Sequence, residues 1–190
     1  MVRTFPRNRP ARSVCVFCGS NFGARAAYRE AARRLGEAIS EHGLALVYGG
    51  ANAGLMGIVA DTVLRGGGKV IGVIPDGLLS GEIAHEGLTE LHRVASLAER
   101  KARMMELSDA FLSLPGGYGT LDELTETVTW AQLGLHGKPC GLLNVEGFFD
   151  PLIAFLDQAV REGFLRPRHR ALVTHDSDPE RLLDPLLDGA

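Results

Sequence analysis

Cysteine is scarce in this chain of 190 residues, which has only three, at positions 15, 18 and 140. An odd and sparse set gives no disulfide framework, which indicates a reducing compartment, and we expect a cytoplasmic protein. Cys15 and Cys18 have the spacing of a redox pair, but they fall on or just after a predicted strand. Because residues three apart on a strand point to opposite faces, the sequence favours two structural cysteines.

Long apolar runs are missing as well. No segment approaches the roughly 18 apolar residues of a membrane-spanning helix, so we expect no membrane association. Residues 1–12 hold four arginines and two prolines and are followed by no apolar signal-peptide core, so we interpret them as a disordered basic tail. The formal net charge of −3 lacks the basic excess that binding to a nucleic-acid polymer needs. With 45% hydrophobic and 23% charged residues, 13–190 fits one globular domain.

Strand-like and helix-like patterns alternate from residue 13 onward. We expect strands at 13–17, 44–48, 70–74, 88–94, 110–114, 140–143 and 171–174, and helices at 24–42, 55–65, 96–108, 120–135, 151–162 and 179–187. This alternation predicts an α/β fold, a Rossmann-like parallel sheet with helices on both faces. Ligands bind beyond the carboxyl ends of the strands in such sheets, and here three strand ends carry glycine-rich turns.

The most specific turn reads Pro-Gly-Gly-Tyr-Gly-Thr-Leu-Asp-Glu, residues 115–123, between a strand and a helix. Its three glycines let the backbone approach a ligand, and the N-terminus of the following helix suits a phosphate. It is not a P-loop, because no Lys precedes Thr120, and the dinucleotide fingerprint would follow the first strand. The alternative is an ordinary turn in which Thr120 and Glu123 form a capping box. That alternative leaves the three glycines unexplained.

Two further strand ends are weaker candidates. Gly50 belongs to a glycine-rich segment, residues 49–57, which suits either a ligand or close packing of a helix on a strand. Ser20 follows the first strand in Cys-Gly-Ser, where its hydroxyl can donate to a phosphate or cap the next helix.

Charged residues outside the glycine turns allow two interpretations. Arg100 and Lys101 lie in a predicted helix. They belong either to a solvated face of that helix or to a site in which the arginine extends over the strand ends toward an anion or leaving group. Glu82 lies in the loop after the third strand and by itself reads as a surface residue. We find no metal-ligand spacing and no Ser-His-Asp set, so we predict no metal site.

Together these segments resemble the LOG ("lonely guy") family of cytokinin-activating phosphoribohydrolases over roughly residues 13–164. The resemblance rests on the 115–123 motif with Arg100-Lys101 upstream, and segments 18–20, 48–50, 54–57, 129–134 and 141–149 support it. It implies hydrolysis of the N-glycosidic bond of a cytokinin riboside 5′-monophosphate, giving free base and ribose 5-phosphate without a cofactor. It also implies a homodimer with active sites near the subunit interface.

The resemblance also assigns residues by position. Arg100 and Glu123 match the catalytic pair. Matches to substrate contacts are the phosphate-binding turn of Gly116, Gly117, Tyr118, Gly119 and Thr120, together with Glu82, Lys101 and Thr129; Ser20 and Gly50 join this set from the strand ends. The chain departs from the family at Leu97-Ala98, where Met-His is usual, and at Asp122, where Glu is usual. The first departure bears on the identity of the base.

Three other functions compete with this interpretation. Proteins of this kind have carried the label lysine decarboxylase, which would normally need pyridoxal phosphate and a Schiff-base lysine, and the chain has only Lys69, Lys101 and Lys138. A non-catalytic nucleotide-binding module is the second alternative. The third keeps the enzyme but takes AMP or another nucleoside monophosphate as substrate.

The predicted homodimer has a sequence argument of its own. Helices 96–108 and 120–135 carry more apolar positions than one stripe facing a sheet would use. These positions are Met104, Met105, Leu107, Val128, Trp130 and Leu133.

Overall fold

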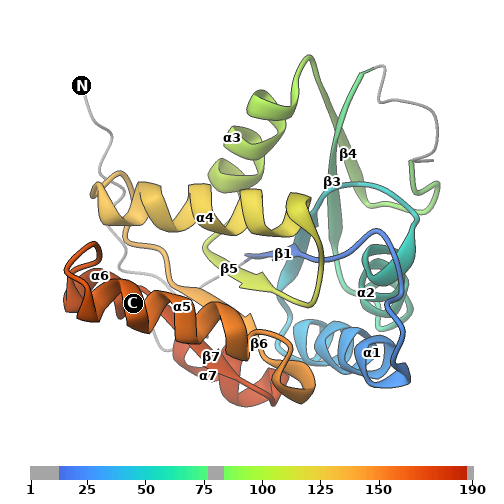
Figure 1. The fold of residues 1–190 in the computed structure, drawn as a ribbon. Helices are drawn as coiled ribbons and strands as arrows, with labels where there is room; N and C mark the ends of the chain where they lie inside the picture. Colours follow the sequence, from blue (N-terminus) through green and yellow to red (C-terminus); the bar gives the residue numbers. More distant parts are fainter. Residues whose placement is uncertain (1–12, 77–83, 188–190) are drawn as a thin grey trace.

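The computed structural model describes residues 13–76 and 84–187. They form a seven-stranded sheet in the order β4-β3-β2-β1-β5-β6-β7, and every neighbouring pair of strands is parallel (Figure 1). The predicted α/β fold with a parallel sheet is therefore confirmed. The predicted tail at residues 1–12 and the candidate Glu82 lie outside the described residues.

The elements follow the predicted order. The strands are β1 Ser13–Phe17, β2 Ala45–Tyr48, β3 Val70–Pro75, β4 Glu90–Val94, β5 Ala110–Ser113, β6 Cys140–Leu143 and β7 Val173–Asp176. The helices are α1 Ala26–Glu41, α2 Gly54–Arg65, α3 Leu97–Leu107, α4 Tyr118–Gln132, η1 Val145–Gly147, α5 Asp150–Arg161, α6 Pro167–Arg170 and α7 Pro179–Leu187. The two short helices, η1 and α6, were not predicted, and β7 begins two residues later than expected.

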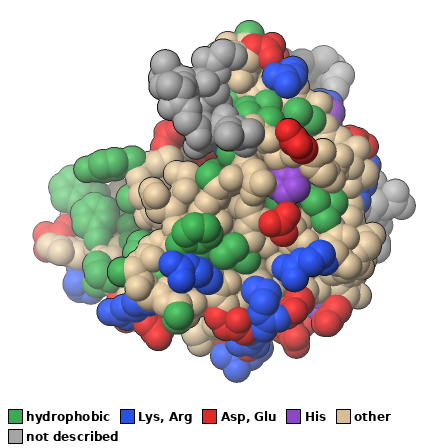
Figure 2. Space-filling view, turned by 90° about the vertical axis from the view of Figure 1, so that its right-hand side faces the viewer, with side chains coloured by type: hydrophobic (Ala, Val, Ile, Leu, Met, Phe, Trp, Pro, Cys, Tyr) green, Lys and Arg blue, Asp and Glu red, His purple; other side chains and the backbone are tan. Residues whose placement is uncertain are grey.

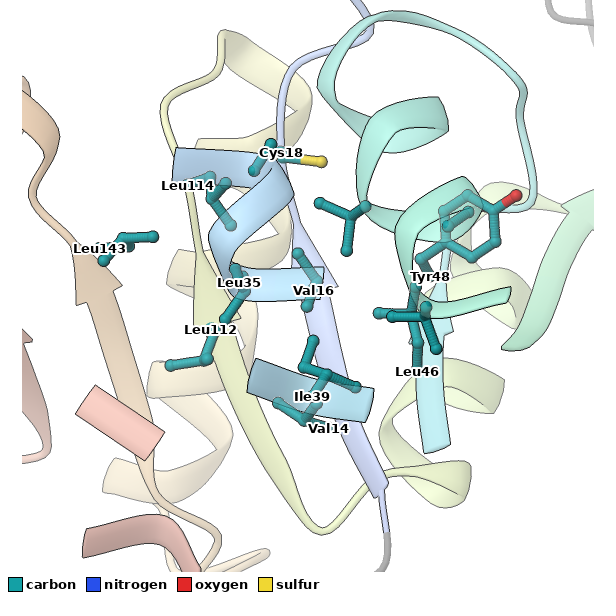
Figure 3. Close-up of a cluster of buried hydrophobic side chains, with 14 of the residues drawn as sticks. Val14, Val16, Cys18, Leu35, Ile39, Leu46, Tyr48, Leu112, Leu114 and Leu143 are labelled. Atoms are coloured by element: carbon teal, nitrogen blue, oxygen red, sulfur yellow. The ribbon is translucent and has the colours of Figure 1, made fainter. Parts of the chain in front are cut away.

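One face of the sheet packs against α1, α2 and α7. Side chains from β1, β2 and β5 meet Leu35 and Ile39 of α1 in a buried cluster (Figure 3). The pattern in β1 shows how the sequence builds it, because Val14 and Val16 point to this face while Cys15 and Phe17 point to the other.

The opposite face is covered by α3, α4 and α5. Met104 and Met105 of α3 are only 1% and 5% exposed and pack with Phe17 and Phe111. The prediction that these two methionines contribute to a subunit interface was therefore wrong, because both are buried in the core of the subunit. Of the six apolar positions counted for an interface, Leu133 is strongly exposed, at 65%.

The cysteines are structural, as predicted. Cys15 and Cys18 are buried in clusters on opposite faces of the sheet, and none of the three cysteines, all of which have described positions, forms a disulfide. Acidic and basic side chains are interspersed over the face shown in Figure 2. Within the part of the chain that the structure describes, no helix is long and apolar enough to cross a membrane.

The strand order fixes where a ligand can bind. Chain connections run outward from β1 in both directions, so the sheet has its switch point between β1 and β5, which are direct neighbours. In open parallel sheets the crevice outside the carboxyl ends at this point takes the ligand. The loops that leave β1 and β5 are the two that carry Cys-Gly-Ser and Pro-Gly-Gly.

Candidate active site

A hollow of about 370 Å³ opens at this switch point. It lies between the loop after β1, the start of α2, the side of α3 and the β5–α4 turn. Its lining residues are Cys18, Gly19, Ser20, Asn21, Phe22, Gly23, Tyr28, Leu55, Met56, Arg100, Pro115, Gly116, Gly117, Tyr118, Gly119, Thr120, Glu123 and Phe148. The sequence-predicted residues Ser20, Arg100, Glu123 and the whole turn 116–120 are thus brought together.

The glycines of the β5–α4 turn divide into two kinds. Gly116 is needed for packing, because a Cβ there would lie 2.1 Å from Thr120 Oγ1 and 2.9 Å from Gly19 N. Gly117 and Gly119 have nothing within 4 Å of a Cβ position. Packing therefore does not require glycine at 117 or 119, and the missing side chains leave the backbone bare toward the hollow.

The N-terminus of α4 is open. Gly117 is its N-cap and offers no side-chain hydrogen bond, and the first turn has no acidic residue. α3 differs, because side chains cap its N-terminus: the Ser96 hydroxyl accepts from Glu99 N at 3.1 Å, and the Glu99 carboxylate accepts from Ala95 N at 2.8 Å. The first N–H groups of α4 therefore point into the hollow with the positive end of the helix dipole, which suits an anion.

The capping interpretation of Glu123 was wrong. α4 begins at Tyr118, so Thr120 is its third residue and Glu123 its sixth, beyond the turn that an N-terminal cap satisfies. Thr120 is 3% exposed, and its hydroxyl packs on Gly116. Glu123 is thereby free of a capping role and points toward α3.

Arg100 and Glu123 face each other inside the hollow. Arg100 Nη2 lies 3.9 Å from Glu123 Oε1, and each side chain is 13% exposed. Arg100 Nε donates to the carbonyl of Val73 at 3.2 Å, which fixes the guanidinium over the end of β3. Gly49 makes room for it, because a Cβ there would lie 1.8 Å from Arg100 Nη2. A fixed cation and a carboxylate therefore share a largely enclosed end of the hollow.

Three predicted substrate contacts lie away from the hollow. Gly50 backs onto Val73 in a left-handed conformation (φ 82°), and its carbonyl accepts from His85 N at 3.0 Å. Lys101 turns toward α4 and pairs with two of its carboxylates. Thr129 is exposed, its hydroxyl donates to the Thr125 carbonyl, and it borders a separate shallow groove between α4 and α5.

Sequence reasoning missed the apolar end of the hollow. Phe22, Tyr28 and Phe148 line it, with the rings of Tyr28 and Phe148 edge to face at 5.8 Å. Nearby, Arg25 pairs with Glu146 at 2.8 Å, and Glu146 adopts a left-handed φ of 49°. Phe148 belongs to the segment 141–149, which supports the family resemblance. Phe22 lies in the loop after β1 and Tyr28 in α1, and nothing in the sequence sets them apart from ordinary loop and helix residues.

The thiol that lines the hollow is not a nucleophile. Burial, with a smaller effect of the Glu123 charge, raises the pKa of Cys18 well above its ordinary range, so the thiolate is not formed at neutral pH. Among the residues with described positions, no group of three or more His, Cys, Asp and Glu is placed to hold a metal ion.

The sequence comparisons agree on one family, and the structural comparison shows the fold. A family model described as "Possible lysine decarboxylase" matches residues 56–186. The chain is 53% identical to a probable cytokinin riboside 5′-monophosphate phosphoribohydrolase of Oryza sativa subsp. japonica, over 92% of this chain and 77% of that protein. It is 48% identical to a cytokinin riboside 5′-monophosphate phosphoribohydrolase of Arabidopsis thaliana, over 93% and 83%. The molybdenum cofactor carrier protein of Chlamydomonas reinhardtii shares the fold, with a TM-score of 0.70 at 20% identity over 95% and 99% of the two chains.

Proposed function

This chain belongs to the LOG family of cytokinin riboside 5′-monophosphate phosphoribohydrolases, and we propose that Arg100 and Glu123 perform the family's hydrolysis in it. The reaction cleaves the N-glycosidic bond of the nucleotide and yields the free base and ribose 5-phosphate. The observation that carries the proposal is the facing of Arg100 and Glu123 at 3.9 Å in the hollow that also holds the open N-terminus of α4.

The 5′-phosphate binds at the β5–α4 turn in this proposal. Gly117 and Gly119 leave the backbone uncovered, and the uncapped N–H groups of α4 supply donors without any side-chain competitor. Ser20 borders the same space from the loop after β1 and adds a hydroxyl donor. Binding the phosphate there places the ribose within reach of Glu123, which stands one to two turns into the same helix.

The bond cleavage needs a general base for the attacking water and a stabilised leaving group, the nucleobase. Water adds to C1′ as the C1′–N bond breaks, the electron pair of that bond goes to the base nitrogen, and the water proton ends on the departing base. Glu123 opposes the positive charge that builds on the ribose, accepts the water proton and then passes it to the departing base, which restores the carboxylate. Arg100 is fixed over the end of β3 and opposes the negative charge on the departing base.

The decarboxylase description of the family model does not fit this site. Such a reaction normally uses a lysine that forms a Schiff base with pyridoxal phosphate. All three lysines have described positions, and none lines the hollow: Lys69 pairs with Glu90, Lys101 with α4, and Lys138 donates to the Met105 carbonyl in the core. The site therefore offers no anchor for that cofactor.

A homodimer is the second part of the proposal, together with a cytoplasmic location. Three exposed apolar side chains lie in the N-terminal halves of α3 and α4, which also carry residues that line the hollow: Leu97 at 58%, Tyr118 at 94% and Leu121 at 36%. Leu133, 65% exposed, follows the far end of α4. A second copy of the chain that covered these side chains would enclose the site and add groups to the part of the hollow that holds the nucleobase. The three free, buried thiols suit a reducing compartment.

The test is a substrate panel. The purified protein is incubated with N6-prenylated AMP, AMP, another nucleoside monophosphate and the matching nucleosides, and free base is measured by chromatography. The expected result is release of base from the N6-prenylated monophosphate. Equal or faster release from AMP would move the assignment to a general nucleoside monophosphate glycosylase. No release from any monophosphate, with binding retained, would support a nucleotide-binding module instead.

A further inference from the structure

Lys101 makes a close set of contacts that the catalytic proposal does not use. Its Nζ lies 2.5 Å from Glu126 Oε2 and 2.9 Å from Asp122 Oδ2, and it donates to both oxygens of Asp122. Glu126 Oε2 is buried and forms an ion pair with Lys101, although the angles of this contact are not those of a hydrogen bond. These contacts join α3 to α4, the two helices that carry the catalytic pair.

The position of Lys101 in the sequence links these contacts to catalysis. Lys101 follows Arg100 directly on α3, and Glu126 follows Glu123 by three residues on α4, so the two carboxylates lie on the same side of that helix. Besides the Lys101–Asp122 pair, two ion pairs thus span the same gap between helices: Arg100–Glu123 at 3.9 Å inside the hollow and Lys101–Glu126 at 2.5 Å beside it. The shorter pair is outside the space available to a ligand, because neither Lys101 nor Glu126 lines the hollow.

The burial of the pair gives it strength. The side chains of Lys101 and Glu126 are 19% and 31% exposed, so solvent screens their attraction less than that of ordinary surface pairs. The Glu126 carboxylate, with Asp122, raises the pKa of Lys101, which keeps the ammonium charged at neutral pH. Val128 and Trp130 of α4, partly buried, also pack against the core cluster that holds Met104 and Met105 of α3.

We infer that Lys101 is a positioning residue: by tying α3 to Glu126 and Asp122 of α4, it sets the separation of Arg100 and Glu123. This inference rests on the proposed catalytic roles of those two residues. It departs from the expectation that Lys101 touches the substrate. Loss of the tie lets α3 move away from α4, and ångström-scale misplacement of a reacting group is enough to slow turnover by about 10²-fold.

The decisive variant is Glu126→Gln, because it removes the closer and more buried carboxylate partner of Lys101 without touching the hollow, and it leaves only the pair with Asp122, whose side chain is 62% exposed. If Lys101 positions Arg100, then Glu126→Gln and Lys101→Met should each lower kcat by about 10- to 100-fold while KM for the nucleoside monophosphate changes by less than about threefold. The double variant should lose little more than Lys101→Met alone, since the lysine variant already breaks the contact that Glu126→Gln removes. Lys101→Arg, which keeps the charge, should recover most of the turnover.

Lys69→Met is the matched control, because Lys69 pairs with Glu90 at 2.6 Å far from the hollow. It should keep the parental kcat and KM, and thermal melts should show that every variant is folded. The inference is overturned if Glu126→Gln behaves like the parent, and in particular if Lys101→Met then raises KM, which would make Lys101 a substrate contact. A parent protein that releases no base would contradict the proposed function rather than this inference.

Discussion

Replacing Glu123 by Gln separates catalysis from folding. The change removes the carboxylate charge while it keeps the shape and helix propensity of the side chain. Its cost to stability is the loss of a 3.9 Å ion pair in which each side chain is 13% exposed. Arg100 keeps its hydrogen bond to the Val73 carbonyl and still borders the open hollow, so the net cost is about 1 kcal/mol. For a domain of this size that corresponds to a melting temperature about 2–4 °C lower.

The expected effect on turnover is far larger. A Gln amide cannot accept the water proton and carries no charge to oppose the ribose, so turnover should fall by about 10²- to 10⁴-fold. That fall corresponds to about 2.7–5.4 kcal/mol in the activation barrier, more than the stability change can explain, because the variant remains almost fully folded.

The assay is base release under saturating monophosphate, paired with a thermal melt of the same sample. Glu106→Gln is the control, since Glu106 also pairs with an arginine, Arg103 at 3.0 Å, but within α3 and with side chains 63% and 40% exposed. Near-parental turnover in Glu123→Gln would refute the reasoning and return Glu123 to a structural role.

Four other outcomes follow from the site. Arg100→Ala should lower turnover by about 10²-fold or more with the protein still folded, and unchanged base release would contradict its role. Nucleoside monophosphates should be cleaved at least about 10²-fold faster than the matching nucleosides, since the latter cannot use the open helix terminus. Gly119→Ala should fold normally, because its Cβ meets open space, yet raise KM by about tenfold or more by covering the phosphate site. Light scattering should give a dimer mass at micromolar concentration; a monomer in the parent would remove the proposed interface.

Most of the fold was readable from the sequence because its signals are local. Each predicted strand and each of the six predicted helices exists, since apolar runs and glycine stops mark them in a doubly covered parallel sheet. The late start of β7 has a local cause that was overlooked. Pro167 at the first position of α6 begins a short helix, which takes up the residues just before Ala171 and delays the strand.

The site was only partly readable, because its assembly depends on contacts between distant segments. The rule that Thr is a preferred helix cap placed the start of α4 at Thr120, but that hydroxyl packs on Gly116 instead. The same limit applies to Lys101, which a motif makes a substrate contact and which the structure turns toward Glu126. Sequence identifies which residue types gather at a strand end, whereas helix rotation decides which of them face the ligand.

The contrast between α3 and α4 shows how the chain divides stability and binding between two helices. α3 carries Arg100, and the side chains of Ser96 and Glu99 accept hydrogen bonds from backbone N–H groups at its N-terminus. These groups of α3 therefore need no ligand. α4 forgoes a side-chain cap, worth about 1 kcal/mol, and keeps glycine in its first turn at a cost of up to about 1 kcal/mol relative to alanine. Packing does not explain the glycine at position 119, because no neighbouring atom lies within 4 Å of the place where its Cβ would be. The end of α4 that lacks this stabilisation is the one that borders the hollow, which supports the proposal that the phosphate binds there.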